Sequence, residues 1–165
     1  MTARQTVDFV ESAAAAVVPM WIMGGWGIDA LLGDETRDHH DLDVLVRVGD
    51  LPALNFMLRR QGFTRAYEWE ENDPCHVDGR TWDTAFVERH HDGREIDVHA
   101  FEVEGGMVSL RMKDPWSLPP GSLDGSGTIC GRVVPCVTAE AQRAMHQGYE
   151  LPEKHREDLR RLDSR

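Results

Sequence analysis

Asp41 and Asp43 are the residues whose type and spacing most directly suggest chemistry. One apolar residue separates them and an apolar run follows, so a β-strand here places both carboxylates on one face and Leu42 and Val44 on the other. Two adjacent carboxylates repel each other unless they hold a cation. Their hard oxygen atoms suit Mg²⁺ or Mn²⁺, with nucleotide phosphates completing the coordination shell. The alternative is a solvated strand edge carrying two acids without a function.

Asp97 is a third acid, set between apolar neighbours in a predicted strand that follows a hairpin turn at 91–93. An unpaired carboxylate in such a strand is costly, so it needs a partner. If this strand lies beside the 41–46 strand, Asp97 completes a cluster of three carboxylates. Two acids then hold metal, and the third bridges one ion and takes a proton from an attacking hydroxyl. His99 shares the face of Asp97 and is a candidate for supporting the acids.

Gly24 and Gly25 connect a short apolar run, 20–23, to a predicted helix at about 26–32 that Gly33 ends. A strand that turns through glycines into a helix presents free backbone N–H groups, which favour a phosphate. The alternative is a tight turn without a ligand.

The alternation of helical and strand patterns predicts a single α/β domain. Helices are expected over 6–18, 26–32, 50–60, 139–147 and 152–162, and strands over 20–23, 41–48, 63–69 (an edge strand), 84–90, 94–101, 128–130 and 133–137. We expect loops over 68–80 and 105–127, and place the first near a substrate because it is acidic and carries Trp69. The last thirty or so residues are expected to form a small helical appendage to the α/β core.

The charge balance restricts the partners. Eighteen basic and 29 acidic residues give a net charge of −11, which argues against a nucleic-acid backbone or an anionic membrane surface and favours a neutral or cationic small molecule. The longest uncharged stretch, 12–28, is shorter than the ~20 residues that span a bilayer, so we expect a cytoplasmic protein. The three cysteines form neither a disulfide framework nor a zinc motif.

Four segments, taken together and in order, resemble the small antibiotic nucleotidyltransferases. They are Gly24-Gly25-Trp26-Gly27-Ile28-Asp29, Thr36-Arg37-Asp38-His39-His40-Asp41-Leu42-Asp43, Ile96-Asp97-Val98-His99, and the stretch from Pro135-Cys136-Val137 through Glu140-Ala141-Gln142 to His146-Gln147-Gly148-Tyr149. The nearest groups are the short lincosamide nucleotidyltransferases and the aminoglycoside 2''-adenylyltransferases, both of the DNA polymerase β-like superfamily. The resemblance covers about 21–162. It implies a nucleotidyltransferase core with a mixed β-sheet flanked by helices over 1–135, and a C-terminal helical segment packed on it over 136–165.

The resemblance also implies roles for individual residues. Asp41 and Asp43 match the paired metal-binding aspartates, and Asp97 matches the third carboxylate, which is a metal ligand and the general base. The cofactor is then Mg²⁺, as two ions, or Mn²⁺, and the co-substrate is a nucleoside triphosphate, ATP or GTP. Gly24 and Gly25 match the phosphate turn, although the wider superfamily usually has Gly-Ser and a shorter gap before the acids.

Four further residues are carried over at the positions that the resemblance gives them. Arg37 and Lys154 are candidate phosphate contacts, and His146 and Tyr149 fall in the stretch that closes over the nucleotide. Packing is the alternative role for His146 and Tyr149, and surface charge is the alternative for Lys154.

The function implied is transfer of a nucleoside monophosphate to a hydroxyl of a small antibiotic-like acceptor, with release of pyrophosphate. An acidic, tryptophan-bearing loop over 68–82 suits a cationic amine, as in lincosamides or aminoglycosides. Two alternatives remain at this point: a toxin-type nucleotidyltransferase acting on tRNA or protein, and a catalytically silent nucleotide-binding module. A homodimer is also open.

Overall fold

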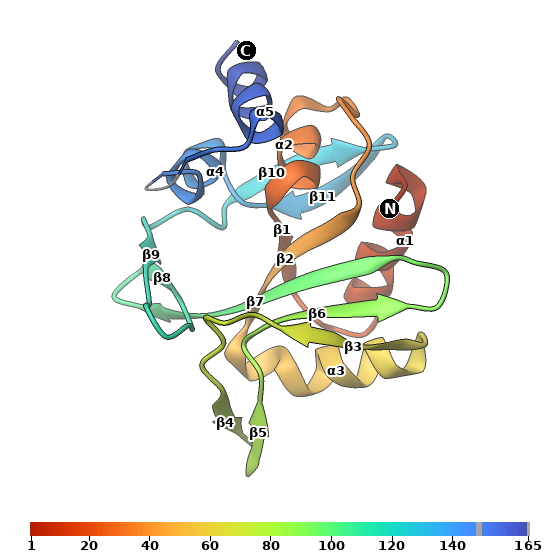
Figure 1. Ribbon diagram of the computed structural model, residues 1–165, viewed down its shortest axis with the longest axis vertical. Helices are drawn as coiled ribbons and strands as arrows, with labels where there is room; N and C mark the ends of the chain where they lie inside the picture. Colours follow the sequence, from red (N-terminus) through yellow and green to blue (C-terminus); the bar gives the residue numbers. More distant parts are fainter. Residues whose placement is uncertain (148–149, 165) are drawn as a thin grey trace.

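The fold is built on a mixed β-sheet with helices on both faces (Figure 1). The computed structural model describes residues 1–147 and 150–164. The helices are α1 (Ala3–Ala15), α2 (Gly24–Leu32), the 3₁₀ turn η1 (Val48–Asp50), α3 (Leu51–Arg60), α4 (Ala139–Met145) and α5 (Glu153–Asp163). The strands are β1 (Met20–Ile22), β2 (Asp41–Arg47), β3 (Phe63–Glu68), β4 (Cys75–Val77), β5 (Arg80–Trp82), β6 (Ala85–His90), β7 (Glu95–Glu104), β8 (Met107–Leu110), β9 (Ser117–Leu118), β10 (Gly125–Ile129) and β11 (Arg132–Cys136).

The strand order is β10-β11-β1-β2-β7-β6-β3. The pairs β1–β11 and β2–β7 are parallel, and the other pairs along this path are antiparallel. β7 is long enough to pair with β6 through its first half and with β8 through its second, and β9 adds to β8. This arrangement confirms the predicted α/β class and the mixed sheet flanked by helices, and it confirms β3 as an edge strand.

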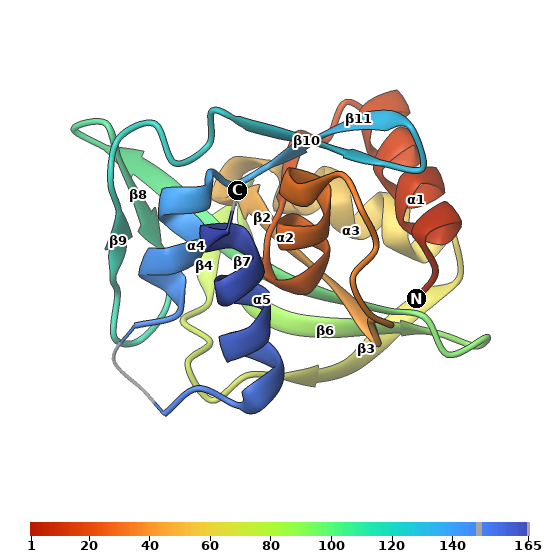
Figure 2. The ribbon, with the colours of Figure 1, turned by 90° about the horizontal axis from the view of Figure 1, so that it is seen from above.

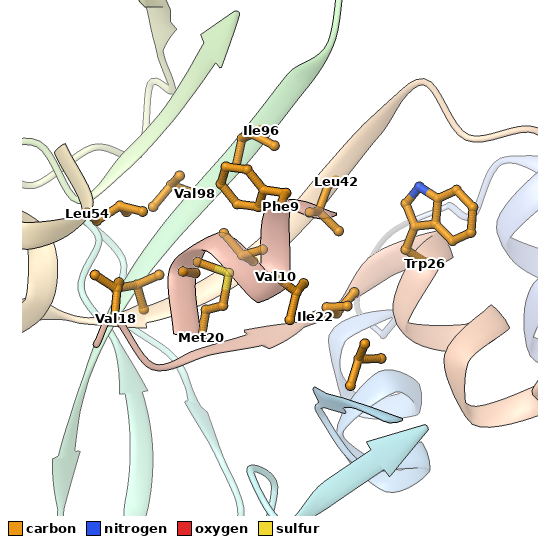
Figure 3. Packing of buried hydrophobic residues seen from close by; sticks show 14 of the residues in the cluster. Phe9, Val10, Val18, Met20, Ile22, Trp26, Leu42, Leu54, Ile96 and Val98 are labelled. Atoms are coloured by element: carbon orange, nitrogen blue, oxygen red, sulfur yellow. The ribbon is translucent and has the colours of Figure 1, made fainter. Parts of the chain in front are cut away.

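The main hydrophobic core lies between the sheet and helices α1 and α3 (Figure 3). Strands β2 and β7 turn alternate apolar side chains into it, as the strand pattern predicts. Leu42, Val44, Ile96 and Val98 are fully buried there. These side chains lie on the face of the sheet opposite the acids, so core packing fixes the direction in which the acids point.

The other face of the sheet carries a smaller apolar cluster and the acids. Leu45, Phe101, Val108 and Leu118 pack there, together with Ala141 of α4. Figures 1 and 2 show α2, α4 and α5 side by side at the end of the molecule where the chain terminates. Each of the two C-terminal helices therefore contacts α2, whose first residues lie beside the acids.

Several predicted boundaries shift, and for local reasons. α1 begins at Ala3 rather than at 6, because the Thr2 side chain accepts a hydrogen bond from the Gln5 backbone N–H and the Gln5 side chain accepts one in return. α2 begins at Gly24 rather than at about 26. Thr138 caps α4, as predicted, by accepting from the Ala141 N–H at 3.3 Å.

The prediction of loops over 68–80 and 105–127 is wrong in part. The 68–80 segment and the residues just after it contain the β4–β5 hairpin, and 105–127 contains β8, β9 and the start of β10. These strands are two to five residues long, which is too short for an alternating pattern to be recognised. Of the helices that the structure describes, none has both the length and the apolar character needed to cross a membrane.

Candidate active site

The sheet register brings three predicted acids together. β2 and β7 are parallel neighbours with Asp43 opposite Asp97, and Asp41 lies two residues before Asp43 on the same face. Asp97 is 6% exposed, whereas Asp41 and Asp43 are partly buried. The predicted condition for the cluster, adjacency of the two strands, is thus met.

The cluster is short of positive charge. Burial raises the pKa of Asp43 from 3.8 to about 8, and the negative charges of Asp41 and Asp97 add to this, against smaller opposing effects of His99 and Lys154. A carboxylate in this state gains most from a nearby cation. The oxygen donors fit Mg²⁺ or Mn²⁺ in chemistry.

The protein side chains alone do not complete a metal site. Within 1–147 and 150–164, no three His, Cys, Asp or Glu side chains are grouped closely enough to hold an ion. A divalent ion here therefore needs additional oxygen ligands, which phosphates or water provide.

Glu95 is a fourth acid on this face that the sequence analysis did not single out. It lies opposite Asp41 in the register and is 7% exposed. Arg89 donates to it at 2.5 Å and His40 approaches it at 3.4 Å. The ion pair with Arg89 separates Glu95 in role from the three aspartates.

The glycine turn lies directly against the acids. Gly24 has a φ of +60°, and a Cβ at this position would overlap the Asp43 carboxylate. At Gly25 a Cβ would overlap the His39 ring and the Arg37 guanidinium. The Met23 N–H donates to the Asp43 carbonyl at 3.0 Å, which fixes the turn to β2. Only glycine fits at these two positions, and the start of α2, whose first N–H groups have no helical partner, faces the acids.

The segment between α2 and β2 is held by a buried acid, Asp29. The Thr36 hydroxyl donates to Asp29 at 2.6 Å and the His39 Nε2 lies 2.5 Å from it. The His39 ring also packs on Trp26, with the ring centroids 4.5 Å apart. Asp29 and His39 therefore position the segment that leads into Asp41.

Arg37, predicted to contact phosphate, is engaged by the C-terminal helix. Its guanidinium donates to Asp158 of α5 at 2.7 Å, and this hydrogen bond raises the pKa of Arg37. Arg161 of the same helix donates to the Thr36 carbonyl at 2.9 Å. Arg37 still lines the cleft, with its side chain 27% exposed, so the predicted phosphate contact and the structural ion pair share one guanidinium.

The C-terminal residues form the far wall of the cleft. His146, Lys154 and His155 line it, and the two histidine rings meet edge to face at 5.1 Å. Burial and the neighbouring His146 and Lys154 lower the pKa of His155. Gln142 of α4 donates to the Gly24 carbonyl at 3.4 Å, linking this wall to the glycine turn. Tyr149, a predicted site residue, lies outside the described residues.

Two side chains hold Asp97. The Trp69 indole Nε1 donates to Asp97 Oδ1 at 2.9 Å, and His99 Nε2 lies 3.2 Å from the same oxygen. Burial lowers the pKa of His99, but the hydrogen bond and the charge of Asp97 outweigh this, so that its pKa is raised. From the sequence we expected His99 to support the acids and the loop that carries Trp69 to lie near a substrate. The contact between Trp69 and Asp97 was not expected.

The acids, the glycine turn and the C-terminal residues His146, Lys154 and His155 line one cleft of about 910 Å³. Its lining also includes Arg37, Trp69 and Glu71. Apolar side chains in the lining include Leu110, Met112, Trp116 and Met145. The cleft thus offers positive charge for an anionic ligand, and aromatic, apolar and acidic side chains for an apolar, cationic one.

A family model supports the same conclusion over nearly the whole chain. The model of the aminoglycoside-2''-adenylyltransferases matches residues 6–162. The chain belongs to this family. It is therefore a member of a nucleotidyltransferase family, as the four segments had indicated.

Individual proteins similar to this adenylyltransferase family member are named for antibiotic resistance or nucleotidyl transfer. A lincosamide resistance protein of Staphylococcus haemolyticus is 26% identical over 149 residues, which are 89% of this chain and 85% of that protein. A 2''-aminoglycoside nucleotidyltransferase of Escherichia coli is 50% identical over 44 residues, a quarter of each chain.

Two solved structures share the fold. The lincosamide antibiotic adenylyltransferase LnuA, bound to lincomycin, superposes with a TM-score of 0.80 at 21% identity over 99% of this chain and 98% of its own. ANT(2'')-Ia, in complex with adenylyl-2''-tobramycin, gives 0.71 at 24% identity over 99% and 89%. At these identities the two structures bear on the fold alone.

Proposed function

We propose that this chain transfers a nucleoside monophosphate from a nucleoside triphosphate to a hydroxyl of a small antibiotic-like acceptor and releases pyrophosphate. The observation that carries the proposal is the placement of Asp41, Asp43 and Asp97 on one face of the sheet beside the glycine turn. Membership of the adenylyltransferase family supports the reaction class and favours ATP as the donor, with GTP as the alternative.

Asp41 and Asp43 hold the metal in this proposal, and Asp97 shares it. The raised pKa of Asp43 supports this assignment, because a buried cluster of acids is stabilised by a divalent cation. When bound, Mg²⁺ neutralises phosphate charge and polarises the phosphorus that is attacked. The missing ligands of the protein site are then triphosphate oxygens.

Asp97 is the proposed general base. It accepts the proton of the acceptor hydroxyl as the hydroxyl oxygen bonds to the α-phosphorus and the bond to pyrophosphate breaks. Its position opposite Asp43 supports a location beside the reacting phosphate. His99 and Trp69 orient its carboxylate.

The triphosphate is proposed to lie along the glycine turn. The free N–H groups of Gly24 and Gly25 at the start of α2 favour an anion. Lys154 and Arg37 supply positive charge in the lining of the cleft, to which His146 also belongs. We retain the proposed role of Tyr149 in closing over the nucleotide, together with a packing role as its alternative.

The acceptor is proposed to be a lincosamide or an aminoglycoside. Two relatives are named for these two classes. Trp69, Glu71 and Trp116, which line the cleft, suit a ring bearing an amine, through ring-face and charge contacts.

We also propose that 136–165 acts as a segment packed on a core formed by 1–135. The contacts of α4 and α5 with α2 support this division, as does the hydrogen bond from Gln142 to Gly24.

Mass spectrometry of the acceptor tests the proposal. Purified protein is incubated with Mg²⁺, with ATP or GTP, and with lincomycin or tobramycin, and pyrophosphate is measured in parallel. We expect one acceptor to gain the mass of one nucleotidyl group, which is a nucleoside monophosphate less one water, with one pyrophosphate per product and no product in EDTA. Transfer without release of pyrophosphate, or product formation in EDTA, would contradict the proposed chemistry.

A further inference from the structure

The Asp97 carboxylate is held from one side. Within the described residues, its two side-chain contacts both fall on Oδ1, from the Trp69 indole at 2.9 Å and from His99 at 3.2 Å. An indole nitrogen can only donate a hydrogen bond, so the Trp69 contact stabilises a charged acceptor at this oxygen. Oδ2 has no side-chain hydrogen bond from the described residues, and Asp97 lines the cleft.

Trp69 is fixed in place by its backbone and by its neighbour Tyr67. The backbone N–H of Trp69 donates to the Ala85 carbonyl at 3.1 Å, and the backbone carbonyl of Trp69 accepts from the Asn72 N–H at 3.0 Å. The Tyr67 ring packs against the indole edge to face at 5.2 Å. The indole is therefore held by the start of β6 and the end of β3, and its contact with Asp97 is not a chance position of a loose side chain.

Asn72 locks this segment further. Its Oδ1 accepts from the backbone N–H groups of Thr84 and Ala85 at 2.8 and 3.2 Å, and its Nδ2 donates to Asp83 at 2.8 Å. Ala85 in turn lies opposite His99 in the β6–β7 register. The two groups that contact Oδ1, the Trp69 indole and the His99 ring, are thus positioned by β6 and β7, and Asp97 itself lies on β7.

We propose that Trp69 is a positioning residue for the transfer reaction: with His99, its indole N–H holds Asp97 Oδ1 so that Oδ2 receives the acceptor proton. This inference rests on the proposed function, in which Asp97 is the base. The proton of the hydroxyl passes to Oδ2 as the new oxygen–phosphorus bond forms, and the electron pair of the broken bond leaves with pyrophosphate. General-base catalysis depends on the orientation of the base, so loss of the restraint lowers the rate of the chemical step.

Trp69 also exposes 38% of its surface and lines the cleft. The competing explanation of its role is therefore that the acceptor packs on the face of the indole ring, which acts as a platform. The two roles differ in the atoms they need. Positioning needs the N–H group, whereas a platform needs the aromatic face. Trp69→Phe keeps a face and removes the donor.

The kinetic experiment compares Trp69→Phe with Trp82→Phe, using Mg²⁺-ATP with lincomycin and with tobramycin. Trp82 is the matched control: although it ends the 68–82 segment, it is not among the described residues that line the cleft, and its indole donates to the Val77 carbonyl within the β4–β5 hairpin. We expect kcat of Trp69→Phe to fall about tenfold with both KM values within about twofold, as for the loss of one charge-assisted hydrogen bond. The control should match the wild type. An unchanged kcat in Trp69→Phe, with or without a raised acceptor KM, overturns the inference.

A spectroscopic measurement does not depend on turnover. The indole N–H resonance of Trp69, identified by its absence in Trp69→Phe, should move when Asp97→Asn replaces the charged acceptor, while the Trp82 resonance stays in place. A Trp69 resonance that is unaffected by Asp97→Asn overturns the inference. The failure of the proposed function itself looks different: Asp97→Asn then retains transfer activity.

Discussion

Asp43 carries a stability cost in the metal-free protein that depends on pH. Its pKa is raised from 3.8 to about 8 by burial and by the charges of Asp41 and Asp97. Between about pH 4 and 8 the folded protein holds a proton that the unfolded chain has released. The free energy of unfolding therefore falls as the pH rises through this window, and levels off above it.

Asp43→Asn should remove that cost. We expect the free energy of unfolding, measured with urea in EDTA, to rise at pH 8 by about 1.4 kcal/mol for each unit by which the pKa of Asp43 in the folded protein exceeds that in the unfolded chain, and by little at pH 4. Asp34→Asn, which removes an exposed carboxylate, should show no such pH-dependent gain. An Asp43→Asn protein no more stable than the wild type at pH 8 would contradict this description of the cluster.

Gly24 allows the glycine turn to approach Asp43, and its replacement should impair function beyond its cost in stability. Gly24→Ala adds backbone strain of about 1–2 kcal/mol at φ +60° and a methyl group that displaces the Asp43 carboxylate. We expect transfer to fall by about a hundredfold or more.

Gly33, at the other end of α2, provides the matched control for Gly24→Ala. Its φ is +72°, but a Cβ there meets no atom within 4 Å. Gly33→Ala should lose similar stability by thermal unfolding and retain transfer activity. Equal activities of the two variants would show that the approach to Asp43 is unimportant.

The site residues differ in how far the sequence reveals them. The alternation around Asp41 and Asp43 and the apolar neighbours of Asp97 are local signals that single out the three acids, and the adjacency of β2 and β7 meets the condition for their clustering. The contact of Trp69 with Asp97 spans 28 positions and that of Arg37 with Asp158 spans 121. No local pattern encodes such contacts, because they depend on how complete elements pack.

Helix α5 is tied to the segment before β2 by a buried ion pair. Asp158 is 3% exposed at its side chain and pairs with Arg37 at 2.7 Å. Asp158→Asn leaves the guanidinium without its charged partner, so we expect the free energy of unfolding to fall by about 2–3 kcal/mol. Transfer should also weaken, because the segment leading into Asp41 loses an anchor.

A second ion pair of α5 serves as the control. Asp163 pairs with Arg143 of α4 at 2.7 Å, but the two side chains are 60% and 43% exposed. Asp163→Asn should therefore change the stability by less than about 1 kcal/mol in urea unfolding. If the two variants unfold alike, the Arg37–Asp158 pair does not anchor the segment.

Elements with long periodic patterns were predictable, as was the short apolar strand β1, whereas four other short strands were not. β2, β6 and β7 follow from alternation and from the turn at 91–93, and α4 follows from its Thr138 cap. The strands β4, β5, β8 and β9 have two to four residues each. β8 pairs with the second half of β7 and β9 adds to β8, so these two depend on the assembled sheet. β4 and β5 pair with each other in a separate hairpin, whose strands are too short for a periodic pattern.

The fold brings three kinds of feature into one cleft: an acidic sheet face, a turn suited to phosphate, and aromatic and acidic side chains suited to a cationic ring. The net charge of −11 agrees with a small cationic acceptor more than with a polyanion. The family match extends over residues 6–162, so the lining of the cleft belongs to the matched region. Within this cleft, we propose that Asp97 takes the proton of the acceptor hydroxyl.

The most direct test is a single-turnover comparison of the wild type with Asp97→Asn, using Mg²⁺-ATP and whichever of lincomycin and tobramycin is modified. We expect Asp97→Asn to fold, to bind nucleotide, and to form the nucleotidylated product more slowly by a factor of about 10³ or more. A folded Asp97→Asn protein that transfers at close to the wild-type rate would contradict this proposal.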